Sequence, residues 1–150
     1  MRVVIQRVKS ASITIEGKAK ESMGSGIVVL FAASKDDIND DSVSKLASKT
    51  AFLRIFSDSQ GKMNLSPLDL GLSVMVVSQF TLFADTKKGN RPSFVAAAEP
   101  NIARMIYDSY VLELRNYPFA EFLTGEFGAH MEIELINDGP VTIIIDTKEW

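Results

Sequence analysis

The segment Ser78-Gln79-Phe80-Thr81, here called the polar block, follows the most apolar stretch of the chain and holds side chains suited to ester chemistry. A serine or threonine hydroxyl attacks a carbonyl group only when a base within hydrogen-bonding distance takes its proton. The chain has a single histidine, His130, which lies among alternating glutamates on a predicted charged strand face. No serine–histidine–aspartate set can therefore be assembled, and we expect no side-chain nucleophile.

The polar block could still act through groups that need no base. Backbone N–H groups at the strand end and the Gln79 amide can hold the charge that develops on a carbonyl oxygen, an effect of about 3–4 kcal/mol for each donor. Such a site needs a nucleophile from elsewhere. The structural alternative is a strand end that is capped by polar residues.

The pair Gly139-Pro140 is the second feature with possible chemistry, and it ends the segment Asn137-Asp138-Gly139-Pro140 between two predicted strands. The simplest interpretation is a hairpin turn. A functional role would need a cis peptide bond before Pro140, which about 5–6% of such bonds adopt in folded proteins. The sequence does not decide between the two.

Three cations, Lys87, Lys88 and Arg91, lie close together after the polar block. The net charge of −3 argues against nucleic-acid binding by the whole surface, because affinity for phosphates depends on Lys and Arg. The charge can still act locally. The cluster is therefore either a solvated loop or an RNA-binding loop.

The composition excludes several other functions. The chain has no cysteine and one histidine, which leaves no thiolate ligands and no histidine-rich metal site, so we expect no metal and no cofactor. No stretch approaches the roughly 20 apolar residues that span a bilayer. The first ten residues carry three cations and no signal-peptide core, so we expect a cytoplasmic protein without membrane contact.

Hydrophobic patterning predicts strands at 2–8 and 12–16, joined by a short turn, a doubly buried strand at 26–33 and a central strand at 73–83. Residues 55–72 should form turns and short extended pieces. Alternation at 130–135 and the run 141–145 predict two further strands.

Two helices are predicted from four-residue spacing. The first begins near Asp41, with Asn39, Asp40 and Asp41 as caps and an apolar stripe of Val43, Leu46, Ala47, Thr50 and Leu53. The second follows Pro100, ends between Arg115 and Pro118, and carries Ile102, Ile106, Tyr110 and Leu114. These elements predict one compact α/β domain over residues 1–150, with a mostly antiparallel or mixed sheet covered by two main helices.

Four blocks in this order resemble the D-aminoacyl-tRNA deacylase (D-tyrosyl-tRNA(Tyr) deacylase) family. They are Met1-Arg-Val-Val-Ile-Gln-Arg-Val8, Val76-Val-Ser-Gln-Phe-Thr-Leu82, Asp85-Thr-Lys-Lys-Gly-Asn-Arg-Pro-Ser-Phe94 and Asn137-Asp-Gly-Pro-Val-Thr142, with Arg54-Ile-Phe and Gly61-Lys-Met-Asn-Leu65 between. The resemblance covers nearly the whole chain. It departs from the family at His130, where Asp or Tyr is common, and over Asn116-Tyr-Pro-Phe-Ala120.

The resemblance implies a three-layer β/β/α domain that forms a homodimer, with two active sites at the subunit interface. The implied activity is hydrolysis of D-aminoacyl-tRNA to free amino acid and tRNA, with L-aminoacyl-tRNA rejected and glycyl-tRNA accepted. No cofactor is implied. The terminal 2′-hydroxyl of the tRNA would assist the attack.

The resemblance also assigns roles to residues. Ser78, Gln79, Phe80 and Thr81 would line the catalytic pocket, with Thr81 a former candidate nucleophile of the family. A cis Gly139-Pro140 pair would enter the partner's site and exclude L side chains by collision. Further implied substrate-binding residues are Asn137, Arg7, which braces the pair, and Phe127 and Met131, which border the pocket.

Two alternatives remain open at this point. One is a non-catalytic RNA-binding dimer that uses Lys87, Lys88 and Arg91, for which the polar block would be unnecessary. The other is hydrolysis of a different small ester.

Overall fold

The computed structural model describes residues 1–37 and 42–150. In chain order the elements are β1 (Arg2–Ile15), β2 (Glu21–Met23), β3 (Gly26–Ala32), α1 (Ser42–Ala51), β4 (Phe56–Ser57), β5 (Met63–Leu65), β6 (Ser73–Ser78), the 3-10 helix η1 (Phe80–Phe83), α2 (Pro100–Arg115), β7 (Phe122–Thr124), β8 (Met131–Asp146) and the 3-10 helix η2 (Thr147–Glu149).

The main sheet is mixed, as predicted. Its strand order is β2-β1-β3-β6-β7, and β8 pairs with β1. Strand β1 is antiparallel to β2, β3 and β8, whereas β3, β6 and β7 run parallel to one another. Strands β4 and β5 form a separate two-stranded sheet.

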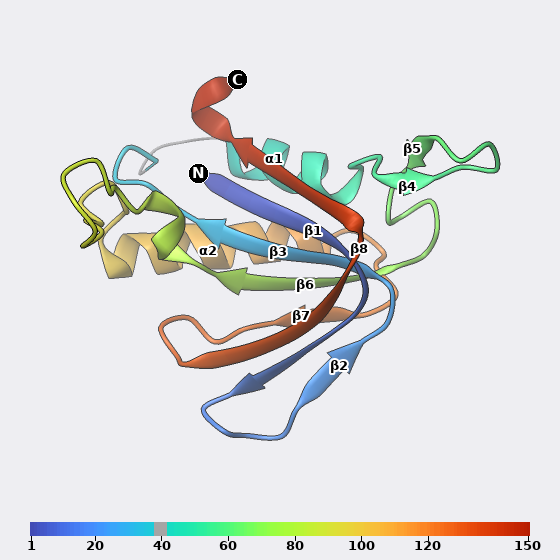
Figure 1. Cartoon of the computed structure of the whole chain (residues 1–150), viewed down its shortest axis with the longest axis horizontal. Coiled ribbons are helices and arrows are strands. Elements are labelled where there is room, and N and C mark those ends of the chain that lie inside the picture. Colours follow the sequence, from blue (N-terminus) through green and yellow to red (C-terminus); the bar gives the residue numbers. More distant parts are fainter. Residues whose placement is uncertain (38–41) are drawn as a thin grey trace.

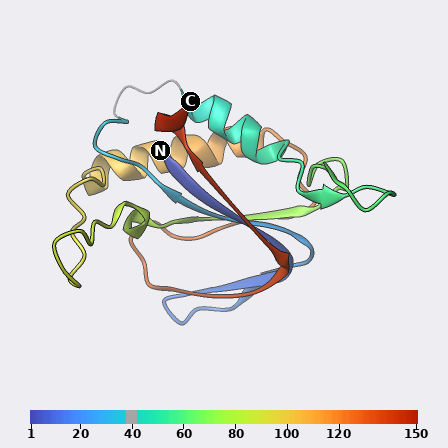
Figure 2. The same ribbon diagram turned by 45° about the horizontal axis from the view of Figure 1, so that its top comes forward.

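The sheet bends over on itself, and this produces three layers (Figures 1 and 2). The later half of β1, the early half of β8 and β2 form a lower β layer beneath the rest of the sheet, and α1 and α2 cover the opposite face. One core lies under the helices and includes Ile27, Val29 and Phe31, while Val28 belongs to a second core between the β layers. Strand β3 is therefore apolar on both faces, and the expected β/β/α architecture is confirmed.

The helices bury the predicted stripes. Helix α1 buries Leu46, Ala47 and Thr50, although Leu53 lies beyond its end. The predicted caps, Asn39 to Asp41, lie outside the described residues. Helix α2 begins at Pro100 and ends at Arg115 as predicted, and the Tyr110 ring stacks on Phe31 with centroids 4.7 Å apart. No helix in the described part of the chain is long and apolar enough to cross a membrane.

The prediction of two amino-terminal strands is wrong, because β1 is one strand of 14 residues. The polar residues Lys9 and Ser10 suggested a turn. Instead, the register with β8 shifts between Gln6 and Val8 and again between Val8 and Ser10. Such irregularities bend a strand without ending it, which lets β1 pass through both β layers.

The predicted strand at 73–83 is too long. Strand β6 ends at Ser78, and the chain then turns at Gln79 into the single turn of η1. Hydrophobic residues continue through this turn because Phe83 is buried, so the apolar pattern does not mark the strand end. The polar block therefore spans a strand end and the start of a 3-10 helix.

The hairpin interpretation of residues 137–140 is also wrong. Residues on both sides of the segment pair with the same strand: Asn137 lies opposite Val8, and Thr142 lies opposite Gln6. Four residues of β8, 138–141, thus face the single residue Arg7 as a bulge. The peptide bond between Gly139 and Pro140 is cis.

Candidate active site

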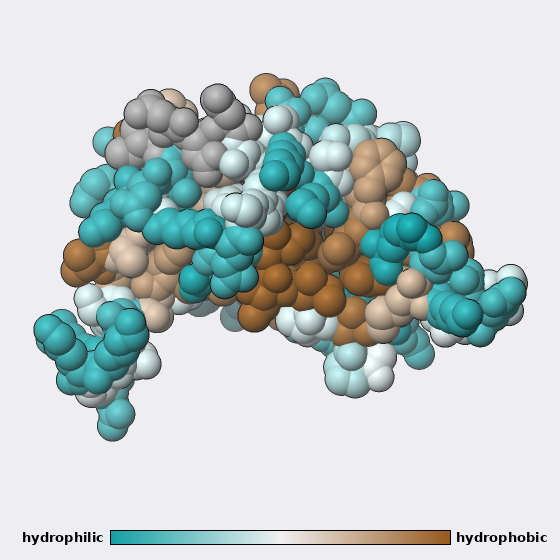
Figure 3. All heavy atoms as spheres, turned by 90° about the horizontal axis from the view of Figure 1, so that it is seen from above, coloured by the Kyte–Doolittle hydropathy of each residue, from teal (hydrophilic) through white to brown (hydrophobic). Residues whose placement is uncertain are grey.

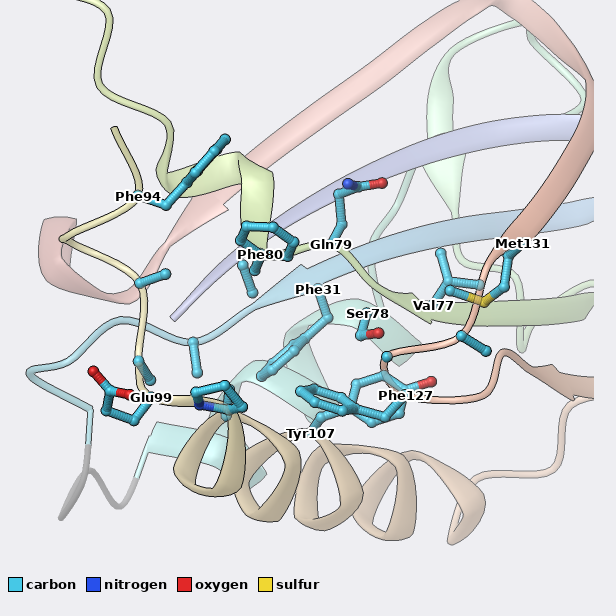
Figure 4. A pocket seen from close by; sticks show the side chains of 18 of the residues that line it. Phe31, Val77, Ser78, Gln79, Phe80, Phe94, Glu99, Tyr107, Phe127 and Met131 are labelled. Atoms are coloured by element: carbon cyan, nitrogen blue, oxygen red, sulfur yellow. The ribbon is translucent and has the colours of Figure 1, made fainter. Parts of the chain in front are cut away.

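A pocket of about 720 Å³ opens beside the polar block. It lies between the ends of β3 and β6, the first turns of α2 and the segment before β8 (Figure 4). The rings of Phe31, Tyr107 and Phe127 form an apolar floor, while Ser78 and Gln79 bring polar groups to its edge. This combination of apolar floor and few polar groups is typical of small-molecule binding sites.

The polar block is attached to the sheet at Gln79. The Gln79 backbone N–H donates to the carbonyl oxygen of Phe31 at 2.7 Å, although β6 has ended. The next residues begin η1, and the first N–H groups of a helix have no acceptor within it. Phe80 lines the pocket and carries one of these N–H groups, whereas Thr81, also expected in the lining, lies outside it. An oxyanion role for the Phe80 N–H stays a prediction.

The side chains of the block form a pair of their own. The Gln79 amide nitrogen donates to the Thr81 hydroxyl oxygen at 2.5 Å. The Thr81 oxygen is therefore an acceptor for this amide, and no carboxylate or imidazole among the described residues is hydrogen-bonded to it. That Thr81 is not a nucleophile stays a prediction from the sequence.

His130 lies closer to the pocket than the sequence suggested. Sequence reasoning left it out of the site, but it contributes to the lining. Its backbone is held by Glu16, which donates its N–H to the His130 carbonyl at 3.0 Å and accepts the His130 N–H at 2.7 Å on a carboxylate oxygen. The residue is exposed, which places it at the outer edge.

Phe127 and Met131 lie in the pocket wall, as implied by the resemblance. The Phe127 ring packs on Tyr107 with centroids 6.0 Å apart. A Cβ atom on Gly125 would lie 2.4 Å from the Met131 sulfur. The missing side chain at Gly125 therefore lets the Met131 side chain lie close against the backbone.

Sequence reasoning missed several lining residues, namely Phe31, Phe94, Glu99 and Tyr107. Tyr107 donates its hydroxyl to the carbonyl oxygen of Val76 at 3.0 Å. Burial raises the pKa of the Tyr107 hydroxyl, so this group stays neutral and acts as a fixed donor. Tyr107 lies outside the predicted apolar stripe of this helix, so no signal in the sequence pointed to it.

Arg7 braces the Gly139-Pro140 pair. Its Nε donates to the carbonyl oxygen of Asp138 at 3.0 Å, and its Nη1 donates to the carbonyl oxygen of Ile55 at 2.6 Å. The Asn137 side chain holds the other end of the bulge, since its Oδ1 accepts the N–H of Val141 at 2.9 Å. Gly139 and Pro140 themselves are exposed.

Within one chain the polar block and the Gly139-Pro140 pair do not meet. Ser78 pairs with Phe31, which faces Val3 and Ile145 through the register of β1. The pair instead lies opposite Arg7, four residues further along β1. The path from β6 through β3 and β1 to β8 crosses three strand spacings of about 4.8 Å, and four residues along β1 add about 3.3 Å each at right angles to it. Together they give a separation of about 20 Å.

The cationic residues project from a closed loop. Asp85 and Ser93 exchange backbone hydrogen bonds at 2.8 and 2.9 Å, which closes the base of residues 85–93, here called the basic loop. Lys87, Lys88 and Arg91 are exposed, and none forms an ion pair within the described residues. The loop extends from the left of the molecule in Figure 1, where Figure 3 shows a hydrophilic projection.

Across the described part of the chain, no group of three or more His, Asp or Glu residues is arranged to hold a metal ion.

Comparison with known proteins gives the class that this fold and site define. The family model D-Tyr-tRNA(Tyr) deacylase matches residues 4–146. Curated relatives named D-aminoacyl-tRNA deacylase are 48% identical in Thermosipho africanus, covering 99% of both chains, and 53% identical in Chloroflexus aurantiacus, covering 99% of this chain and 92% of the relative. A third, in Bacteroides thetaiotaomicron, is 49% identical over 99% of this chain and 98% of its own.

Solved structures share the fold. The c-Myc DNA Unwinding Element Binding Protein superposes with a TM-score of 0.89 at 37% identity, covering 98% of this chain and 99% of that one. A "probable eukaryotic D-amino acid tRNA deacylase" gives a TM-score of 0.81 at 16% identity, over 96% and 97% of the two chains, and shows the fold alone.

These matches define a class of hydrolases that act on aminoacyl-tRNA. The chain belongs to the D-aminoacyl-tRNA deacylase family. The resemblance and the enzyme class expected from the sequence are thereby confirmed.

Proposed function

We propose that two copies of this chain form a cytoplasmic homodimer that hydrolyses D-aminoacyl-tRNA at sites shared between the subunits. The observation that carries the two-subunit site is the separation within one chain. The polar block and the Gly139-Pro140 pair lie about 20 Å apart by strand register, too far to touch one substrate carbon. A two-fold pairing brings the pair of one subunit to the pocket of the other.

The surface around the bulge supports such a pairing. Ile136 and Ile144 flank it on β8 and are 58% and 66% exposed. Large apolar side chains so exposed are favourable contacts for a partner surface. Figure 3 shows hydrophobic residues across the middle of one face, beside the hydrophilic projection.

The chemical step begins with water attacking the ester carbonyl of the substrate. The terminal 2′-hydroxyl of the tRNA assists this attack, because no carboxylate or imidazole among the described residues is hydrogen-bonded to the Thr81 hydroxyl, whose side-chain partner is the Gln79 amide. The Phe80 N–H and the Gln79 amide hold the oxyanion. The bond between the carbonyl carbon and the ribose 3′-oxygen then breaks. That oxygen takes up the proton that the attacking water gave up, which releases the amino acid and the tRNA.

Chirality is decided by exclusion. The exposed Gly139-Pro140 pair of the partner lies against the substrate α-carbon on the side where an L side chain would project. Glycine has no side chain to collide, so glycyl-tRNA is also a substrate. Arg7 and Asn137 hold the bulge in place, and Phe127 and Met131 complete the pocket.

The basic loop contacts the tRNA backbone. Its root, Phe94, packs edge-to-face on Phe80 with centroids 5.0 Å apart, so the loop adjoins the pocket rim. Lys87, Lys88 and Arg91 are exposed and without ion pairs among the described residues, which leaves their charges available to phosphates.

The test is hydrolysis of tyrosyl-tRNA in both configurations and of glycyl-tRNA by the purified protein. D-tyrosyl-tRNA and glycyl-tRNA should be deacylated and L-tyrosyl-tRNA should persist. Replacing the terminal 2′-hydroxyl by hydrogen should abolish turnover while binding remains. Equal hydrolysis of both enantiomers, or of neither, would contradict the proposal.

The basic loop also favours one second candidate, a non-catalytic RNA-binding dimer. This candidate predicts salt-sensitive binding of uncharged tRNA as tight as that of charged tRNA, without ester cleavage. Stereoselective release of D-tyrosine by the purified protein would eliminate it.

A further inference from the structure

Arg2 connects the amino terminus of the fold to η1. Its Nη1 donates to the carbonyl oxygen of Leu82 at 2.8 Å, and the centre of its guanidinium lies 4.8 Å from the centroid of the Phe83 ring. Both contacts fall in the last half of η1. Arg2 therefore holds the end of the helix that lies opposite Gln79.

The short helix needs such a contact. A single turn of helix is not stable alone, and the last carbonyl groups of a helix have no donor within it. Gln79 fixes the start of η1 through its bond to Phe31, and Arg2 supplies the donor at Leu82. The N–H groups of Phe80 and Thr81 lie between these two attachments.

Asp146 holds Arg2 in place. Arg2 donates from Nε and Nη2 to the same carboxylate oxygen of Asp146, at 3.0 and 2.7 Å. The other oxygen accepts the N–H of Lys148 at 3.1 Å. The Asp146 side chain is only 9% exposed, so this carboxylate has little freedom to move.

We propose that Arg2 and Asp146 are positioning residues for catalysis, acting through η1. Neither lines the pocket, so neither touches the substrate. Together they fix the backbone turn that aims the Phe80 N–H group at the oxyanion. A misplacement of about 1 Å can cost about a hundredfold in rate. This inference rests on the oxyanion role in the proposed function.

The test measures kcat and KM for D-tyrosyl-tRNA in Arg2→Ala, Arg2→Lys and Asp146→Asn. We expect kcat to fall by about 10- to 100-fold in Arg2→Ala while KM changes less than about twofold, since oxyanion contacts form in the transition state. Arg2→Lys should recover part of the activity, because lysine can reach one acceptor but not bridge both. Hydrogen exchange across residues 80–84 should speed up in the folded variants.

The matched control is Glu134→Gln, which removes another ion pair of β8, the 2.8 Å contact with Lys20, at a position opposite Ser12 of β1. It should leave kcat unchanged. Gln79→Ala serves as the reference for the proposed function. If Gln79→Ala lowers kcat and folded Arg2→Ala does not, the positioning role is wrong while the proposed function stands.

If Gln79→Ala also leaves kcat unchanged, the oxyanion role itself is wrong. If Arg2→Ala does not fold, the decision rests on Arg2→Lys and Asp146→Asn. Unchanged kcat and unchanged exchange at residues 80–84 in both would overturn the inference.

Discussion

Arg7 donates from Nε to the carbonyl oxygen of Asp138, 3.0 Å away, and so holds the residue directly before the Gly139-Pro140 pair. The same guanidinium donates to the carbonyl oxygen of Ile55 at 2.6 Å, which ties the bulge to the segment before β4. A Cβ on Gly139 would lie 3.0 Å from Arg7 Nη2, so the bulge and its brace are in close contact. The position of the pair thus depends on a strand distant in sequence.

Removing this brace should loosen the bulge. Arg7→Ala leaves two carbonyl groups without their donors, which costs about 1–3 kcal/mol of unfolding free energy for a buried group. We expect hydrolysis of L-tyrosyl-tRNA to rise relative to that of the D enantiomer. Urea unfolding and paired hydrolysis assays measure the two effects. If folded Arg7→Ala hydrolyses L- and D-tyrosyl-tRNA in the wild-type ratio, Arg7 does not control how the Gly139-Pro140 pair excludes L side chains.

The Thr81 hydroxyl should be dispensable for the chemistry. Because it accepts the Gln79 amide at 2.5 Å, Thr81→Ala frees that amide, which costs about 0.5–1.5 kcal/mol and lowers kcat by about 2- to 10-fold. Thr81→Ser keeps the acceptor and should retain the wild-type rate. Single-turnover hydrolysis of D-tyrosyl-tRNA measures both. Complete loss of activity in Thr81→Ala would instead favour Thr81 as the nucleophile.

The basic loop should control the salt dependence of tRNA binding. For each phosphate that Lys87→Ala or Lys88→Ala no longer neutralises, the slope of log affinity against log salt should become shallower by about 0.7–0.9. Lys9→Ala removes an exposed cation outside the loop and should leave the slope unchanged. Binding titrations at several salt concentrations give these slopes. Equal slopes in all three variants and the wild type would exclude the loop from the interface.

Acid should weaken the fold partly through Asp146. Burial opposes ionisation, but the Lys148 N–H, Arg2 and the amino terminus outweigh it and hold the pKa of Asp146 below its ordinary 3.8. A lowered pKa in the folded state contributes stability above 3.8, and this contribution is lost as the pH falls through the folded-state pKa. Asp146→Asn should therefore lower the unfolding free energy near neutral pH.

Urea unfolding of wild type and Asp146→Asn between acidic and neutral pH measures this effect. The difference between the two proteins should be constant at neutral pH and shrink in the acidic range. A difference that does not change with pH would contradict the assignment to Asp146.

The local pattern of apolar and polar residues predicted the helices that bury one face and the strand that is buried on both. The stripes of α1 and α2 and the doubly apolar β3 could be predicted because apolar side chains are buried and polar ones face solvent. The polar strand end at the polar block was predicted for the same reason, since polar side chains there follow an apolar run.

Contacts between residues far apart in the sequence could not be predicted from the local pattern. Residues 137–140 read as a hairpin because the signal for a turn is local, whereas the partner that made them a bulge is Arg7, more than a hundred residues earlier. The predicted strand at 73–83 ran past the end of β6. Phe83 is buried from a turn of 3-10 helix, and a buried helix residue is as apolar as a buried strand residue. Tyr107 was not singled out from the sequence, because nothing in its spacing shows that one edge of the core opens into a pocket.

The central claim is that each active site takes its polar block from one subunit and its Gly139-Pro140 pair from the other. Mixed dimers of Gln79→Ala and Gly139→Val subunits test it directly. A valine at Gly139 is strained, because φ is +131° there and its Cβ would lie 2.8 Å from a Val141 side-chain carbon. The strain should displace the pair from the partner's pocket, so each variant alone should be impaired. In a mixed dimer, the wild-type Gln79 of one subunit meets the wild-type Gly139 of the other.

Random mixing in equal amounts should therefore restore roughly a quarter of the wild-type sites. The measurement is D-tyrosyl-tRNA hydrolysis before and after the two inactive proteins are unfolded and refolded together. We expect activity to reappear only after joint refolding. No recovery, with mixed dimers present by mass, would contradict a site shared between the subunits.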